Sequence, residues 1–163
     1  MDEKYIQKNA LKVKPIKNGT VIDHIPEGLA LRVLYIVGIP DPYGNIATLA
    51  MNVKSKNGKK DIVKVENREL ERYEVNQIAL IASKATINII RDFEVVDKYQ
   101  VELPNEIIGL AKCSNPTCIS NSNEPIKSRF EVIERDPPRI KCHYCDREPE
   151  DIYSCLNLNS EIK

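Results

Sequence analysis

The sequence predicts an α+β fold, in which an N-terminal ferredoxin-like antiparallel sheet carries two helices on one face and a small antiparallel β domain follows. Two observations support this prediction. The hydrophobic pattern runs in the order strand, helix, strand, strand, helix, strand, strand, which is the split βαβ pattern with one strand added. In addition, all five cysteines lie at or after position 113, so the composition changes along the chain.

The first strand and the first helix are expected within residues 10–38. Residues 10–17 alternate apolar and basic side chains, which indicates a strand, and residues 21–26 are its continuation or a following loop. Residues 27–38 predict a helix, with Pro26 and Glu27 suited to its first turn and Gly38 to its C-terminal cap. Because its surface is apolar almost all round, this helix should be deeply covered.

A hairpin, a second helix and two further strands complete the N-terminal part. They are predicted, in that order, over residues 47–55 with 59–67, over 73–85, and over 85–103 with a division near Arg91 and Asp92. Pro104 then interrupts the pattern. The sequence therefore predicts two domains, residues 1–103 and 104–163.

Composition and charge exclude several classes of protein. With 24 basic and 24 acidic residues the net charge is zero, so no global field attracts nucleic acid or an anionic membrane. The N-terminus carries charges where a signal peptide would be apolar, and the densest apolar stretch, residues 29–39, contains Arg32 and is too short to cross a bilayer. We therefore expect a cytoplasmic protein with free or metal-bound thiols.

The cysteines carry the strongest chemical signal. Cys113 and Cys118 are separated by four residues, Cys142 and Cys145 by two, and 23 residues lie between the pairs. Two such pairs can present four thiolates to one tetrahedral ion, which indicates Zn²⁺. Disulfides and small buried apolar side chains are the alternatives. Four thiolates leave no open position for water, so the zinc should be structural and should stabilise a module too small to fold unaided.

The other residues of this module do not indicate a further chemistry. Cys155 lies outside the pairs and is interpreted as a small buried residue, and His143 is not interpreted as a ligand because it should point away from the ion. Basic side chains could suggest a zinc module that binds nucleic acid, but acidic side chains between residues 124 and 151 dilute that charge. A module that contacts another protein is the favoured interpretation.

Asp23 and His24 form an adjacent acid and base in GTVIDHIP. The pair does not predict catalysis, because the chain has no nucleophile elbow, phosphate loop or GxGxxG motif to complete a site. On an extended strand the two side chains would also point to opposite faces. Binding a ligand requires fewer groups than catalysis. The Asp23 carboxylate could accept hydrogen bonds from sugar hydroxyls, and His24 with Lys60, Lys64 and Lys98 could face phosphates. Solvated charges on a sheet face are the alternative.

These motifs resemble the regulatory chain of aspartate carbamoyltransferase. The resemblance rests on GTVIDHIP, KKDIVKVEN, ATINIIRDFEVV and the two cysteine pairs, in this order over nearly the whole chain. It implies a non-catalytic regulatory subunit of pyrimidine biosynthesis that binds CTP and ATP, with UTP as a further candidate. It also implies a second regulatory chain bound through the N-terminal domain and a catalytic chain bound through the zinc domain, with no nucleic acid or membrane as partner.

The resemblance assigns residues to two sites. Asp23 and Lys64 would meet the ribose, His24 the triphosphate, and Lys98 both ribose and phosphates. Asn88 would share the pocket, and an apolar group would line base and sugar, namely Val13, Ile16, Ile90, Phe93 and Val95. One Zn²⁺ per chain would be held by Cys113, Cys118, Cys142 and Cys145.

Two positions depart from the family pattern. Lys14 stands where the most familiar member has an acidic residue, and Phe93 where that member has tyrosine. Both changes lie beside the expected base, so the preferred nucleotide and the sign of the response stay open. A free zinc-ribbon nucleic-acid binder and an independent enzyme are the competing classes.

Overall fold

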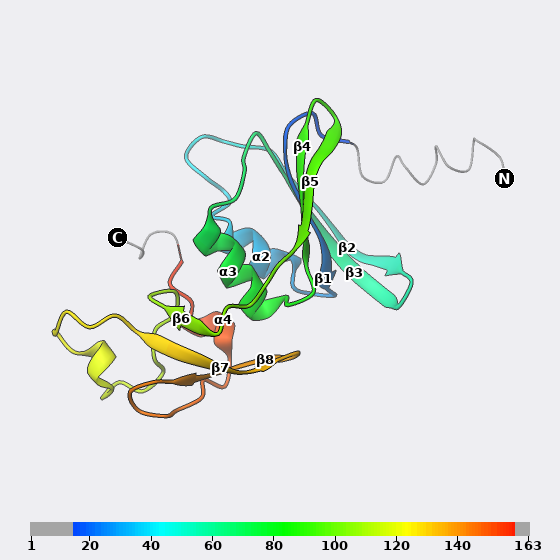
Figure 1. The fold of residues 1–163 in the computed structure, drawn as a ribbon. Helices are drawn as coiled ribbons and strands as arrows, with labels where there is room; N and C mark the ends of the chain where they lie inside the picture. The colour runs from blue at the N-terminus through cyan, green and yellow to red at the C-terminus, as the bar shows by residue number, and fades with distance from the viewer. Residues whose placement is uncertain (1–14, 159–163) are drawn as a thin grey trace.

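The computed structural model describes residues 15–158, which form two antiparallel sheets and three α-helices (Figure 1). The N-terminal part comprises β1 (Gly19–Pro26), α2 (Ala30–Ile36), β2 (Ala47–Ser55), β3 (Gly58–Glu66), α3 (Arg72–Ile81), β4 (Thr86–Arg91) and β5 (Glu94–Gln100). The C-terminal part comprises β6 (Glu106–Ile108), a short 3-10 helix η1 (Ile119–Asn121), β7 (Arg129–Arg135), β8 (Pro138–Cys142) and α4 (Ile152–Cys155).

The large sheet has the strand order β2-β3-β1-β4-β5, and every neighbouring pair is antiparallel. Helices α2 and α3 cover one face of it, and the small sheet β6-β7-β8 lies beyond the helices (Figure 1). The order β2-β3-β1-β4 is that of a ferredoxin-like sheet, and β5 extends it at the edge. The predicted fold class is confirmed.

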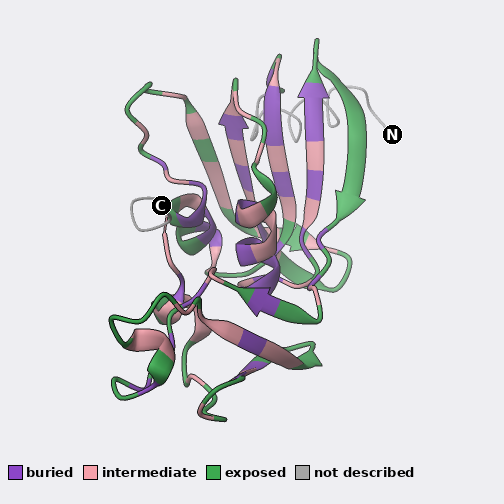
Figure 2. Cartoon of the chain, turned by 60° about the vertical axis from the view of Figure 1, so that its left-hand side comes forward, coloured by how far each residue is buried: buried purple, intermediate pink, exposed green. Residues whose placement is uncertain are grey.

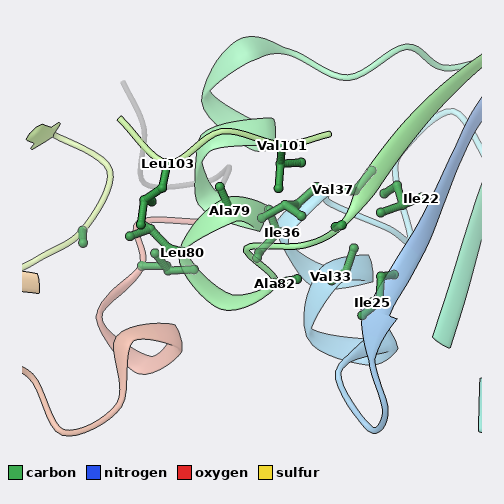
Figure 3. Close-up of a cluster of buried hydrophobic side chains, with 14 of the residues drawn as sticks. Ile22, Ile25, Val33, Ile36, Val37, Ala79, Leu80, Ala82, Val101 and Leu103 are labelled. Carbon is green, nitrogen blue, oxygen red and sulfur yellow. The ribbon is translucent and has the colours of Figure 1, made fainter. Parts of the chain in front are cut away.

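One buried apolar cluster lies between the large sheet and its helices and continues into the C-terminal part. Ile22 and Ile25 of β1 pack with Val33 and Ile36 of α2 (Figure 3). The same cluster includes Ile107, Phe130, Ile140 and Cys142 of the small sheet. Burial follows this arrangement, since the central strands are buried on the helix side whereas β5 is exposed along its length (Figure 2).

The first strand differs from the prediction. Residues 1–14 lie outside the described part of the chain, residues 15–17 are not a strand, and β1 begins at Gly19. Pro15 has no N–H to donate to a ladder. Gly19 has φ 142° and lies so close to β3 that a Cβ atom would be 2.1 Å from the Val65 carbonyl oxygen. Only glycine fits this start of the strand.

Helix α2 is shorter and more exposed than predicted. Pro26 ends β1 instead of opening the helix, and α2 starts at Ala30, whose N–H donates to a distant carboxylate, that of Asp61 on β3. Leu31 and Tyr35 are 52% and 55% exposed, so the expectation of a deeply covered helix was wrong. The predicted end is confirmed: Gly38 has φ 77° and its N–H donates to the Tyr35 carbonyl.

The other N-terminal elements match the predicted order, but α3 and β5 end earlier than predicted, β5 at Gln100. The two strands of the first hairpin join at Lys56 and Asn57, as expected. Helix α3 ends at Ile81, four residues early, because the Ala85 carbonyl already accepts from the Val101 N–H beside β5. Asp92 and Phe93 form the turn between β4 and β5, both with positive φ, which suits a two-residue hairpin turn.

Among residues 15–158, none of the helices is both long and apolar enough to cross a lipid bilayer.

Candidate functional site

The four paired cysteines converge in the C-terminal part. Their sulfur atoms all lie within 4.8 Å of one another. Cys113 Sγ is 3.6 Å from Cys145 Sγ, and Cys118 Sγ is 3.7 Å from Cys142 Sγ. A tetrahedral ion with metal–sulfur bonds of about 2.3 Å requires sulfurs about 3.8 Å apart. The donor set and the spacing therefore fit one tetrahedral metal ion of the kind that thiolates prefer.

Side-chain amides hold the first pair of cysteines in shape. Asn121 Nδ2 donates to the carbonyls of Cys113 and Asn115, at 2.9 and 2.7 Å. Asn115 Oδ1 accepts from the N–H and the hydroxyl of Thr117, which closes the turn before Cys118. The second pair follows directly from β8, which ends at Cys142. The two cysteine turns are thus fixed by local hydrogen bonds and by the small sheet.

Burial and local hydrogen bonds shift the pKa values of three of the four thiols. Burial raises the pKa of Cys113 to about 12 and raises that of Cys142 as well. At Cys145 burial also tends to raise the pKa, but hydrogen bonds from the Arg147 N–H and the Asn115 side chain outweigh this effect and lower the pKa to about 7. Metal ions bind thiolates, so binding here displaces protons from the buried thiols.

Cys155 and His143 lie near the cluster but are not part of it, as predicted. All five cysteines are free, and Cys155 on α4 is half-buried and lies outside the cluster, so it is less buried than predicted. His143 is exposed and its Nδ1 lies 3.3 Å from Glu131 Oε1, away from the four sulfurs.

The face of the large sheet that is turned away from the helices, called the open face below, gathers polar residues singled out in the sequence, three of which form a row across the strands. Paired residues of neighbouring antiparallel strands share a face. Val21 on β1 pairs with Lys64 on β3 and with Asn88 on β4, and Asn88 pairs with Lys98 on β5. The row from Lys64 to Lys98 therefore crosses three strand spacings, about 14 Å at about 4.8 Å each.

Asp23 and His24 lie beside the middle of this row, two and three residues beyond Val21 on β1, at a β-bulge. The register of β1 against β3 shifts between Ile22 and Ile25, so Asp23 and His24 occupy the place of one residue, and His24 has φ 56°. His24 Nδ1 lies 3.8 Å from Asp23 Oδ2 and 3.3 Å from Thr86 Oγ1. The expectation that the two side chains point to opposite faces was wrong, because the bulge interrupts the alternation.

Charge on the open face is mixed, with Lys64 and Lys98 at the two ends of the row. Lys60 Nζ lies 2.9 Å from Asp23 Oδ1, which fixes the carboxylate. Burial lowers the pKa of Lys64, a sign that the ammonium is partly desolvated by the sheet around it. Asn88 Nδ2 donates to the Val21 carbonyl at 3.2 Å, and this bond sets the orientation of its amide.

The apolar residues expected around a base flank the row on the side opposite Asp23 and His24, toward the turn between β4 and β5. Ile90 on β4 pairs with Val95 on β5, and Phe93 occupies the turn between these strands. The Phe93 N–H donates to the Lys17 carbonyl, next to Ile16. Ile16 and Ile90 are buried, whereas Phe93 and Val95 are exposed. Val13 falls outside the described residues.

Thr86 was missed by the sequence reasoning, and Lys60 was named only as a candidate. Thr86 contacts His24, and Lys60 contacts Asp23. Alternation along β4 could have found Thr86, because it lies two residues from Asn88 and so shares its face.

Comparison with known protein families gives two matches that together span the described chain. Residues 11–102 match the model of the aspartate carbamoyltransferase regulatory chain, allosteric domain, and residues 105–158 match that of the metal binding domain of the same chain. Similar proteins include aspartate carbamoyltransferase regulatory chains of three archaea. That of Methanothrix thermoacetophila is 57% identical over 138 residues, 84% of this chain and 90% of the relative. That of Methanothermobacter thermautotrophicus is 53% identical over 147 residues (88% and 94%), and that of Thermococcus onnurineus 50% over 149 (91% and 98%).

Proposed function

The chain belongs to the family of aspartate carbamoyltransferase regulatory chains, and from this premise we propose that it binds nucleoside triphosphate effectors on its open face. CTP and ATP are the main candidates and UTP a third. Residues 1–103 would form the nucleotide domain, which also pairs with a second regulatory chain. Residues 104–163 would form a domain that holds one Zn²⁺ and docks on the catalytic chain, in the cytoplasm.

The observation that carries the nucleotide proposal is the row of Lys64, Asn88 and Lys98 on β3, β4 and β5, with Asp23 and His24 beside it on β1. An anionic triphosphate and a polar ribose need cations, an imidazole and a carboxylate within one ligand length. The apolar groups around Ile90 and Phe93 supply a surface for a base at the far end of the same face.

The identity of the ion is proposed from its donors. Four thiolates at tetrahedral spacing favour Zn²⁺, which has no geometric preference of its own and needs no open coordination site for a structural task. Bound there, it would supply the link between the turn at Cys113 and the end of β8 at Cys142.

Regulation would require that the nucleotide bind with different affinity to two states of the assembled complex. The nucleotide would contact β3, β1, β4 and β5, and the small sheet continues the same buried cluster. A preference of the nucleotide for one of the two states could thus be transmitted through this cluster to the domain that docks on the catalytic chain.

The first prediction concerns the nucleotide site. Titration calorimetry of CTP and of ATP into the full chain should show binding, and Lys98→Ala should weaken it about tenfold, since one charge-assisted hydrogen bond contributes about 1.4 kcal/mol. His24→Ala should act in the same direction. Lys59→Ala is the matched control, because Lys59 shares the side of β3 that carries Asp61.

Equal affinities in the wild type, Lys98→Ala and His24→Ala would contradict the site. Salt-dependent binding to an arbitrary DNA duplex, with no nucleotide binding, would instead favour a zinc-ribbon protein that contacts nucleic acid.

A further inference from the structure

Gln77 of α3 is a polar side chain buried at the junction between the two sheets. Its side chain is 0% exposed. Its Nε2 donates to two backbone carbonyls of the C-terminal part, that of Leu110 at 3.1 Å and that of Asn157 at 2.5 Å. Among the described residues Oε1 has no hydrogen-bond partner. An apolar side chain of equal length would fill the same space without burying an unpaired oxygen. What the glutamine amide adds is therefore its two donated hydrogen bonds.

The two carbonyls belong to a short ladder, called the C-terminal ladder below, between residues 109–112 and 155–157. The Lys112 N–H donates to Cys155, the Asn157 N–H donates to Leu110, and Ala111 pairs with Leu156. The ladder leads directly into Cys113, the first ligand of the metal cluster. From its position on α3, Gln77 thus donates a hydrogen bond to each of the two strands of the ladder.

Helix α3 is in turn packed against the segment that directly follows the strand carrying Lys98. After β5 the chain continues through Val101 and Leu103, which are buried in the same cluster as Ala79 and Leu80 of α3 (Figure 3). A displacement of β5 would therefore move Val101 and Leu103 against α3. Helix α3 would in turn act on the C-terminal ladder through the hydrogen bonds of the Gln77 amide.

We infer that Gln77 is a positioning residue that couples the nucleotide face to the metal domain through its bonds to Leu110 and Asn157. The inference rests on the proposed function, since it needs a nucleotide bound on the open face. It requires that the ladder respond to nucleotide in the wild-type chain and lose that response when the two donors are removed.

The test is hydrogen exchange of the full, metal-loaded chain with and without saturating CTP, and again with ATP. In the wild type we expect at least one of these nucleotides to change the exchange rate of the Lys112 and Asn157 amides by about threefold or more. Gln77→Met keeps length and volume but has no donor, so this change should disappear while nucleotide affinity stays within about twofold. Asn76→Met, the same replacement one residue earlier on α3, should leave the response intact.

In the complex reconstituted with the catalytic chain, Gln77→Met should reduce the nucleotide-induced shift in half-saturating aspartate to about one fifth or less, with metal content unchanged. A full nucleotide response in Gln77→Met would overturn this inference but not the proposed function. The same holds if the wild-type chain binds nucleotide and the exchange rates of its ladder do not change. The wild-type measurement decides even if the variant does not fold. A wild-type chain that binds no nucleotide would overturn the proposed function, and the inference with it.

Discussion

Replacing Cys113 by serine should abolish metal binding and unfold the C-terminal part of the chain. The hydroxyl is a poor ligand for a thiophilic ion, and structural Zn²⁺ contributes about 10–16 kcal/mol of apparent binding energy in small modules. The three-stranded sheet β6-β7-β8 buries few large side chains, chiefly Ile107, Phe130 and Ile140, which are too few to replace that energy. Metal content should fall from one ion per chain to none, and association with the catalytic chain should be lost.

Cys155→Ser is the matched control, because Cys155 lies outside the cluster although it belongs to the same module. Elemental analysis identifies the ion and counts it, and gel filtration with the catalytic chain reports assembly. A Cys113→Ser chain that keeps one ion and still assembles would refute the structural role of the cluster. Loss of metal in Cys155→Ser would show that a fifth thiol takes part.

Local sequence patterns predict most of this fold because they follow local physical rules. The spacing of the cysteine pairs identified the cluster, since each pair lies on one turn and a single ion needs both. The order of strands and helices gave the ferredoxin-like sheet, and Gly38 marked the end of α2 through its positive φ.

The missed features depend on residues that are distant in sequence. The bulge at Asp23 and His24 is defined by the register of β1 against β3, which cannot be derived from GTVIDHIP alone. Likewise, α2 begins at Ala30 because Asp61, 31 residues later, accepts its N–H. The sequence could identify the polar residues of the open face, but their alignment into one row follows from strand pairing.

Asp61→Ala should produce the second large effect, a loss of folding stability of about 3 kcal/mol. The Asp61 carboxylate is fully buried and accepts three backbone N–H groups: Gly28 at 2.8 Å, Ala30 at 3.1 Å and Asn52 at 2.9 Å. Ala30 is buried and its N–H would be left unpaired, whereas Gly28 and Asn52 are exposed and water can partly replace their bonds, so we take about 1 kcal/mol for each bond to the carboxylate. The carboxylate thus joins β3 to the start of α2 and to a bulge of β2, where the register against β3 shifts between Ala50 and Val53.

A buried carboxylate also costs free energy, because it leaves water, and removing it recovers that cost. We expect the three lost bonds to outweigh the recovery, since alanine supplies no acceptor and the start of α2 then has no cap. Urea unfolding of the metal-loaded chain, followed by circular dichroism, measures the difference. Asp97→Ala removes the same charge from exposed β5 and should change stability by less than about 0.5 kcal/mol. If Asp61→Ala were equally mild, desolvation would balance the three bonds, and Asp61 would set the position of α2 without stabilising the fold.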